Sequence, residues 1–561
     1  MIPPAGWNQT YLLFGQGLGF SALIAALPIF TLLLLLGVLR KPAWIAGLSG
    51  LGVTFAVALG AYRMPPVTAI SAAANGAAFG LFPITWVVFW AIALFRVTVE
   101  TGQFEIIKDS IGRLTSDSRL QAILIAFAFG GFLEGAAGFG TPVAIAATML
   151  IGLGFSPFSA AAICLLANTA PVAFGSIAIP VVTLAGLTGI PLAKLSAAIG
   201  RICAPVSFFI PGYLIVALGG FRSLSGIFVP TLLTGATFAI VQFLVSTYIG
   251  PQLTDMLASL TAISALVLYL RFWHPKQILD PARATPFACI TGTVRPGLAF
   301  AEGTRTLPAY GGGTVLFAWL PYGIMVACVL LSGAVPIQAV LNKVTVLVPW
   351  PFLHDVVRRM PPIVPSATPY HAVFNLNWLS ASGTACMIAT FLTALCVRIS
   401  LQDFVRLLMG VVYKLRLPTL TLASVLGLAF LMNYCGATAT LGLEFSATGA
   451  IFPFFSALLG WVGVFLTGSD TSANALFGNL QVVTASRLGL DPVLMAAANS
   501  SGGVMGKMIS LQTIAIAVAA TGLAQPDEGK LFRFTFKHSI LLASVIGLIV
   551  LLYTYVFHFK W

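Results

Sequence analysis

The amino-acid sequence predicts an all-α polytopic membrane protein with about twelve transmembrane helices and two re-entrant hairpins. Its 561 residues are 59% hydrophobic and only 8% charged, with a mean hydropathy of +1.00. Soluble domains carry about 25% charged residues, so an ordinary soluble protein is excluded. Apolar stretches of about 20 residues, enough to cross ~30 Å of hydrocarbon, recur along the whole chain. We therefore expect a single transmembrane domain over residues 1–561, in contact with the lipid bilayer.

Twelve apolar runs are long enough to cross a membrane. In chain order the predicted spans are residues 20–40, 43–62, 82–99, 158–190, 203–220, 226–249, 253–270, 313–334, 371–397, 419–435, 490–523 and 538–559. The loops 271–312 and 335–370 are rich in Pro, Gly and charge, which is typical of connectors.

Two further apolar segments, residues 120–154 and 448–487, are interrupted at their centres by Gly, Ser, Thr and Asp. Each arm is too short to cross comfortably alone. A backbone break at membrane depth is tolerated only where protein or a water-filled cavity satisfies its polar groups. We therefore interpret both segments as re-entrant hairpins.

The 28 Lys and Arg residues outnumber the 15 Asp and Glu residues, giving a net charge of +13. In a membrane protein such an excess gathers in cytoplasmic loops, so it indicates orientation and not a nucleic-acid partner. With the Arg40–Lys41 loop inside, 18 basic residues lie inside and 8 outside, both termini face out, and Arg96 and Lys507 lie at membrane depth. The basic residues on the outer side include Lys194, Arg201, Lys343, Arg358 and Arg359.

The sequence offers little for catalysis or for a cofactor. The seven cysteines contain no C-x-x-C motif, and the five histidines form no metal-ligand cluster along the chain. Gly506-Lys507 resembles part of a phosphate-binding loop, but Ser501 and Met508 occupy positions that require Gly and Ser or Thr. We therefore expect no metal, no cofactor and no enzymatic activity.

An internal repeat gives the chain its organisation. The matching pairs are FLEG at 132–135 with FLTG at 465–468, LGFSP at 153–157 with LGLDP at 488–492, and Asn168-Thr169 with Asn499-Ser500. Their offsets of 333, 335 and 331 residues are nearly equal, and the three matches keep the same order. We place repeat 1 at about 65–220, connecting helices and loops at 221–397, and repeat 2 at about 398–560.

The charges that precede the two hairpins indicate that the repeats are inverted. Residues 100–119 carry Lys108, Arg113 and Arg119, whereas residues 436–447 contain no Lys or Arg. The first segment is therefore expected inside and the second outside. Inverted repeats are typical of secondary transporters, which hold substrate and coupling ion near the midplane. An ion channel would share glycine-rich hairpins, but it would pass current without saturable uptake.

The interrupted segments are the candidate substrate site. Glycine lets backbone N–H groups approach a ligand, and a helix that starts after a break presents positive partial charge to a carboxylate. The candidate substrate-binding residues are Gly135, Gly138, Gly140 and Thr141 in the first tip, Gly468, Ser469 and Thr471 in the second, and Asn168, Thr169, Asn499, Ser500 and Ser501 in the helix breaks. The alternative interpretation is that Gly and Pro merely allow close helix packing and kinks.

Three ionisable residues, Glu134, Asp470 and Lys507, lie at or beside the breaks. Ionisable groups inside a membrane are costly and indicate function by default. A buried carboxylate gains from taking up a proton, so Glu134 and Asp470 are the candidates for proton coupling. Lys507 would either attract a substrate carboxylate or neutralise one of the acids, and the sequence leaves both roles open.

Four long segments resemble the bacterial L-lactate permease family, and the likeness covers essentially the whole chain. They are FLEGAAGFGTPVAIAA (132–147), FPFFSALLGWVGVFLTGSDTSANALFGNLQ (452–481), AANSSGGVMGKMIS (497–510) and FRFTFKHS (532–539). The resemblance implies a multi-pass inner-membrane symporter that takes up L-lactate, glycolate and D-lactate with protons. It also implies a place in a wider superfamily of ion transporters with inverted repeats and an elevator motion. Relatives of that type are often homodimers, although the oligomeric state of this chain stays open.

The sequence departs from that superfamily at the hairpin tips. Relatives that use sodium often carry Ser-Asn-Thr at both tips, whereas the second tip here reads Ser469-Asp470-Thr471 and the first has no such triplet. With Glu134 beside the first tip, this favours a proton over sodium. Leu511 stands where many family members have proline, and we infer no change of substrate from it. Sodium-coupled uptake of a di- or tricarboxylate is the nearest alternative, and Lys507, the single cation in the core, disfavours it.

Overall fold

The computed structural model describes residues 6–138, 140–275 and 310–558, so most of the predicted connector 271–312 lies outside the described residues. The N-terminal part contains β1 (Trp7–Asn8), α1 (Leu18–Leu33), α2 (Ala43–Ala56), α3 (Pro66–Phe79), α4 (Trp86–Glu100) and α5 (Gln103–Gly112). Wider π-helical turns extend α1 to Val38 and α2 to Ala61 and join α3 to α4 over Gly80–Thr85.

Two stretches share one order of elements: two helical arms that fold back on each other, then a bent pair of helices. Hairpin 1 comprises α6 (Ser118–Gln121), η4 (Ala122–Phe129), α7 (Gly130–Ala136) and α8 (Thr141–Gly152), followed by α9 (Pro157–Ala167), η5 (Val172–Phe174) and α10 (Gly175–Thr188). Hairpin 2 comprises α19 (Phe452–Thr467) and α20 (Asp470–Leu488), followed by α21 (Pro492–Gly506), η10 (Lys507–Ile509) and α22 (Leu511–Thr521). The bent pairs turn by 65° and 41° respectively.

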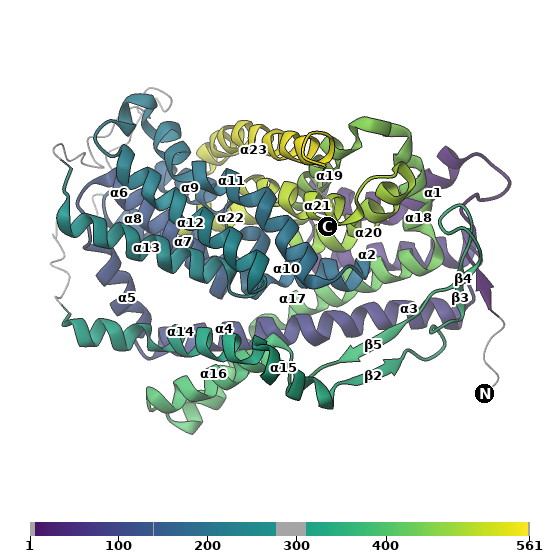
Figure 1. Ribbon diagram of the computed structural model, residues 1–561, viewed down its shortest axis with the longest axis horizontal. Helices are drawn as coiled ribbons and strands as arrows, with labels where there is room; N and C mark the ends of the chain where they lie inside the picture. The colour runs from purple at the N-terminus through teal and green to yellow at the C-terminus, as the bar shows by residue number, and fades with distance from the viewer. Residues whose placement is uncertain (1–5, 139, 276–309, 559–561) are drawn as a thin grey trace.

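The remaining helices surround these elements. They are α11 (Leu192–Gly219), α12 (Phe228–Tyr248), α13 (Thr254–Phe272), α14 (Gly312–Gly333), α15 (Val335–Leu341), α16 (Ser382–Cys396), α17 (Leu401–Cys435), α18 (Ala437–Phe445) and α23 (Gln525–Tyr555), with 3-10 turns η6 (Phe221–Leu224), η8 (Asn342–Val344) and η9 (Ser446–Ile451). In Figure 1 most helices run along the long axis, with α4, α14 and α16 on one side and α11, α12 and α23 on the other.

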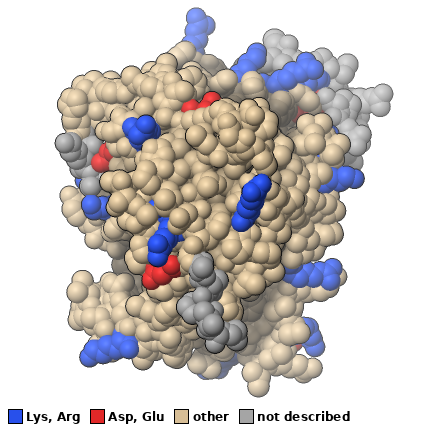
Figure 2. Space-filling model, turned by 90° about the vertical axis from the view of Figure 1, so that its right-hand side faces the viewer, with Lys and Arg blue, Asp and Glu red and all other residues tan. Residues whose placement is uncertain are grey.

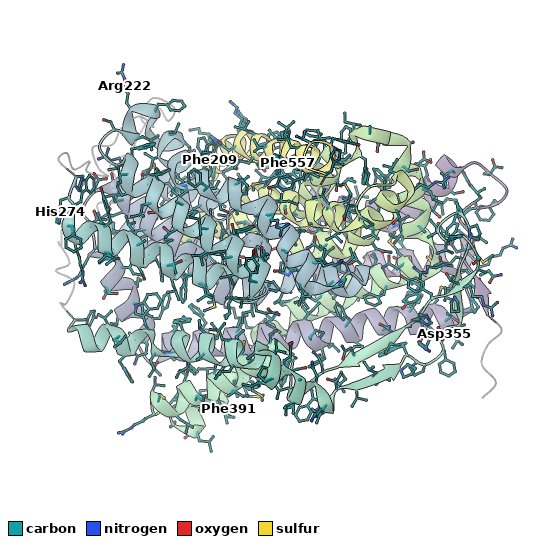
Figure 3. The ribbon with its side chains drawn as sticks, viewed as in Figure 1. Phe209, Arg222, His274, Asp355, Phe391 and Phe557 are labelled. Carbon is teal, nitrogen blue, oxygen red and sulfur yellow. The ribbon has the colours of Figure 1, made fainter. Side chains whose placement is uncertain are left out.

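The described residues contain 11 helices that are long and apolar enough to cross a membrane, or up to 13 if each bent pair is one span. This agrees with the predicted architecture of about twelve spans. Large apolar side chains such as Phe209 and Phe391 are exposed on the outside of the bundle, as labelled in Figure 3. Arg222 and His274 lie at one end of the molecule and Asp355 at the other. The apolar surface between the two ends is suited to contact with lipid.

Several predicted boundaries were wrong. The span expected at 82–99 is the second half of a 35-residue span over Pro66–Glu100, and the span expected at 419–435 begins at Leu401. The first arm of hairpin 1, Ser118–Ala136, is 19 residues long and apolar enough to cross the membrane. The expectation that this arm is too short to cross alone was therefore wrong. That the hairpin tips end within the membrane stays a prediction.

The predicted connector 335–370 and the first residues of the predicted span 371–397 form strands. They are β2 (Val346–Pro349), β3 (Val357–Arg359), β4 (Thr368–Pro369) and β5 (Val373–Leu376). β2 pairs antiparallel with β5, while β3 lies between β1 and β4. The predicted span 371–397 therefore begins as helix only at Ser382, because β5 pairs with β2 and its side chains are alternately exposed and half-buried, as in a strand.

Glycines allow α19 and α21 to touch backbone to backbone. A Cβ atom added at Gly460 would overlap the backbone of Asn499, and one added at Gly502 would overlap that of Ala457. The same holds for Gly506 against Trp461. For these glycines the interpretation as close-packing residues is confirmed.

We expect Gly502→Ala to destabilise the protein, because its methyl group has no space between the two helices. The thermal midpoint of unfolding in detergent should fall, and the monodisperse fraction after extraction should decrease. Gly323→Ala is the matched control, since Gly323 is also inside a helix but has nothing within 4 Å of the added atom. Equal midpoints for the two variants would contradict this account of the contact.

Candidate functional site

A cavity of about 270 Å³ lies between the two hairpin tips. Residues from α2, α7, α10, α17, α20, α22 and η10 line it, so both hairpins and both bent helix pairs contribute. Seven predicted site residues line the cavity: Glu134, Gly140, Gly468, Ser469, Asp470, Thr471 and Lys507. Eight others do not line it: Gly135, Gly138, Thr141, Asn168, Thr169, Asn499, Ser500 and Ser501.

The tip of hairpin 1 turns through left-handed glycines. Gly138 has φ 56° and Gly140 has φ 81°, which favour glycine because a Cβ atom would be strained there. α8 then begins at Thr141 with Pro142 in its first turn, where a missing N–H costs no hydrogen bond. Glu134, in the last turn of α7, is 3% exposed. A Cβ atom at Gly175 would lie only 2.8 Å from its Oε1, so this glycine makes room for the carboxyl group.

The tip of hairpin 2 presents a capped helix N-terminus to the cavity. Gly468 ends α19 with φ 72°, and the Ser469 Oγ accepts a hydrogen bond from the Ser472 N–H at 3.3 Å. Asp470 is the first residue of α20 and is 3% exposed. Its Oδ2 accepts hydrogen bonds from Ser500 Oγ at 2.6 Å and Asn474 Nδ2 at 3.3 Å. Its Oδ1 is buried and has no hydrogen-bond partner within the described chain.

Lys507 brings a positive charge to the same cavity. It follows α21 directly, and its Nζ donates a hydrogen bond to the Gly468 carbonyl oxygen at 3.0 Å. Within the described residues Lys507 forms no salt bridge with Glu134 or Asp470. An ammonium group has three donors, so two N–H groups remain for a ligand.

The polar residues of the second helix break support hairpin 2 from behind. Asn499 Nδ2 donates to Asn474 Oδ1 at 2.9 Å, and Asn499 Oδ1 accepts from Gln481 Nε2 at 3.2 Å. Asn499, Ser500 and Ser501 are fully buried. In this conformation Asn499 and Ser500 fix α20 and orient Asp470, and do not face the cavity.

The polar residues of the first helix break, Asn168 and Thr169, also do not line the cavity. Thr169 donates its hydroxyl to the Leu166 carbonyl at 2.7 Å, which is a local helix contact. Asn168 is 4% exposed, and its side chain lies beside the Glu134 carboxyl group. Whether these predicted residues bind substrate in another conformation stays a prediction.

A left-handed turn at the start of α10 was not predicted. Ser176, Ile177 and Ala178 have φ values of 49°, 57° and 61°, a conformation that costs L-residues roughly 1–2 kcal/mol each. Ser176 lines the cavity, and its Oγ donates to the Ala137 carbonyl at 3.3 Å, which joins α10 to the tip of hairpin 1. No sequence pattern identifies such a turn, because none of the three residues is glycine.

Asp255 is a buried acid beside hairpin 1 that sequence reasoning missed. It lies in the first turn of α13, is 1% exposed, and neither carboxyl oxygen has a hydrogen-bond partner within the described chain. A Cβ atom at Gly135 would lie 2.9 Å from the Asp255 Cβ, so α13 touches hairpin 1 beside Glu134. The rule that selected Glu134, that intramembrane acids indicate function, applies equally to Asp255.

Two histidines meet outside the cavity, contrary to the expectation that the histidines form no cluster. His371 Nδ1 lies 2.6 Å from Asp355 Oδ1, and His354 Nε2 lies 3.2 Å from Asp355 Oδ2. The sequence could not show this contact, because the strands between Asp355 and His371 bring them together. The group is largely exposed, at the end of the molecule where Figure 3 labels Asp355, and such groups are common without an ion.

Solved structures offer only weak likenesses. The chain aligns with the Alcanivorax borkumensis YdaH transporter at 15% identity and a TM-score of 0.46, covering 95% of this chain and 98% of that one. It aligns with Neisseria gonorrhoeae MtrF at 12% identity and a TM-score of 0.43, covering 86% and 82%. Likenesses at this level do not define the fold.

Sequence relatives are far more similar. The chain is 44% identical to an L-lactate permease of Bacillus subtilis, covering 98% of this chain and 99% of that protein. It is 41% identical to the glycolate permease GlcA of Escherichia coli and 40% identical to an L-lactate permease of the same organism, each covering 98% of both chains. A family model described as L-lactate permease matches residues 21–557. The chain therefore belongs to the L-lactate permease family, whose members are membrane transporters and not enzymes.

Proposed function

We propose that this protein is a proton-coupled symporter that takes up L-lactate and related 2-hydroxymonocarboxylates, glycolate and D-lactate, across the bacterial inner membrane. The observation that carries the proposal is the cavity between the hairpin tips, where Lys507 and the start of α20 meet Glu134 and Asp470. The relatives named L-lactate permease and glycolate permease support this choice of substrates.

The polar groups of the cavity suit a small hydroxy acid with one negative charge. The Lys507 ammonium and the N-terminus of α20 attract a carboxylate. Thr471, Ser472 and Gln512 also line the cavity and offer partners for a 2-hydroxyl group. Lys507 is the only Lys or Arg among the described lining residues, so a di- or tricarboxylate would leave charge uncompensated.

Proton coupling follows from the acids beside the ammonium. While Glu134 and Asp470 are protonated, Lys507 is free to bind the substrate carboxylate. Loss of the proton gives a carboxylate that competes for Lys507 and expels the anion. The two protonation states therefore bind substrate differently, which is what a ligand-driven change of state requires. The unpartnered Oδ1 of Asp470 and Oε2 of Glu134 support proton uptake at these atoms.

The repeated order of hairpin and bent helix pair supports two repeats, at about 65–220 and 398–560, and the charges that precede the hairpins favour an inverted relation between them. In this proposal an elevator-type motion of the hairpins carries the cavity between the two sides of the membrane. α10 and α20 both begin at the cavity, one in each repeat, so the two repeats would enclose the substrate jointly.

Uptake by the purified protein in proteoliposomes tests the function directly. We expect an inward proton gradient to drive accumulation of labelled L-lactate, since the coupling groups are acids. A sodium gradient alone should have no effect, and unlabelled glycolate and D-lactate should compete better than succinate. Accumulation that required sodium, or that succinate competed best, would overturn the coupling and the substrate class.

Glu134→Gln and Asp470→Asn should separate coupling from exchange. Each variant removes a titratable proton while it keeps a side chain of similar size, so we expect pH-driven accumulation to fall at least ~10-fold, as expected for a lost acid–base group. Counterflow of lactate should stay measurable, because exchange needs no net proton movement. Asp403→Asn is the control, since Asp403 is exposed and its carboxyl group contacts Arg406 and Ser400 at the surface. Full accumulation by both core variants would exclude these acids as coupling groups.

Lys507→Met should raise the KM for L-lactate by about 10-fold or more, because a charge-assisted contact contributes about 1.5–3 kcal/mol. Lys507→Arg keeps the charge and should retain part of the affinity. Initial uptake rates over a range of substrate concentrations measure both. An unchanged KM in the methionine variant would favour the alternative role of Lys507 as a structural counter-charge.

A further inference from the structure

A second cavity, of about 530 Å³, lies at the other end of the same two helices. α10 and α20 both start at the hairpin cavity, with Ser176 and Asp470, and both end at the second cavity, with Gly189 and Arg487. The two cavities are therefore in line along the α10–α20 pair.

The packed middle of that pair separates the cavities. Asn474 Nδ2 on α20 donates to the Pro180 carbonyl on α10 at 3.2 Å. Further along, a Cβ atom at Gly478 would overlap Leu184, so the helices touch there without a gap. In this conformation only the hairpin cavity contains Glu134, Asp470 and Lys507.

The second cavity has a positive lining. Arg359 and Arg487 line it together with side-chain amides such as Asn75, Asn433 and Asn479, and no Asp or Glu is among its described lining residues. Neither arginine forms a salt bridge within the described chain. Both positive charges are therefore available to a soluble anion.

Arg359 is held in place without losing its charge. Its guanidinium carbon lies 4.8 Å from the centre of the Tyr370 ring, and its Nε is buried with no hydrogen-bond partner within the described chain. Burial raises the pKa of the Tyr370 phenol, although Arg359 opposes the rise, so the tyrosine is neutral at pH 7. Nothing in this contact cancels the charge of the arginine.

Arg358 and Arg359, the two arginines of β3, point to opposite faces of the sheet. β3 pairs with β1 on one side and β4 on the other, and successive side chains of a strand point to opposite faces. Arg358 is exposed and lies against Gly6, whereas Arg359 faces the cavity. Both belong to the basic residues that the charge rule places on the outer side.

The end of the molecule with β3 and β4 is seen in Figure 2. Lys and Arg side chains are more frequent there than Asp and Glu. A small anion that approaches this end therefore meets a positive field, which a concave, low-dielectric surface strengthens.

We propose that the second cavity is an outward vestibule in which Arg359 and Arg487 collect carboxylate anions before they enter the hairpin cavity. This inference rests on the proposed uptake of monocarboxylates. The arginines attract the carboxylate, and the amide side chains offer partners for a hydroxyl group. The proposed motion of the hairpins would then bring the hairpin cavity within reach of the vestibule.

Initial rates of L-lactate uptake by proteoliposomes, with the β3 end of the protein facing the outer solution, test the vestibule. Arg359→Gln and Arg487→Gln should each raise KM about 3- to 10-fold with little change in maximal rate, because local anion concentration is lost and not the transport step. In the wild type the ratio of maximal rate to KM should fall as ionic strength rises, and in both variants this fall should be smaller. Arg359→Lys keeps the charge and should restore most of the affinity. Arg358→Gln, on the same strand but outside the cavity, is the control and should match the wild type.

The possible failures are distinguishable. Saturable wild-type uptake with an unchanged KM and salt dependence in both Arg→Gln variants would exclude the vestibule while the proposed function stands. An equal KM rise in Arg358→Gln would also exclude it, since the effect would then come from overall charge. Absence of wild-type L-lactate uptake would overturn the proposed function itself. If Arg359→Gln does not fold because of its contact with Tyr370, the exposed Arg487 gives the same outcomes.

Discussion

The backbone contact between α19 and α21 is the constraint on which the cavity depends. Because Gly460, Gly502 and Gly506 have no side chains, α21 lies close enough for Ser500 to donate to Asp470. The same closeness carries Lys507, the residue after α21, to the carbonyl of Gly468. A larger residue at any of the three glycines would separate the helices and disconnect these groups together.

The buried polar residues around the cavity fall into two classes. Asn474, Asn499 and Gln481 form hydrogen bonds with one another and stiffen hairpin 2, although the Gln481 Oε1 has no partner within the described chain. Glu134, Asp470 and Asp255 keep carboxyl oxygens without partners within the described chain. Unpaired polar atoms are costly when buried, and they are retained where a ligand or a proton uses them.

The sequence predicted the architecture well because its strongest signals are local. Hydropathy identified most spans, and the offset between Glu134-Gly135 and Thr467-Gly468 located both hairpin tips. Predicted span boundaries were wrong where they rested only on the length of an apolar run. Examples are the span that begins at Leu401 and the strands around Val373. Asp255 and the meeting of His354 with His371 depend on contacts between distant segments, which no single segment encodes. The roles of Asn499 and Ser500 as supports also needed the packing of α20 against α21.

The left-handed turn at Ser176, Ile177 and Ala178 is a store of conformational energy beside the hairpin 1 tip. At roughly 1–2 kcal/mol for each residue, the three together hold about 3–6 kcal/mol. Changing a two-state population from 1:99 to 99:1 takes about 5.5 kcal/mol. A rearrangement that let this short segment relax would therefore release free energy of the size that decides between two conformations.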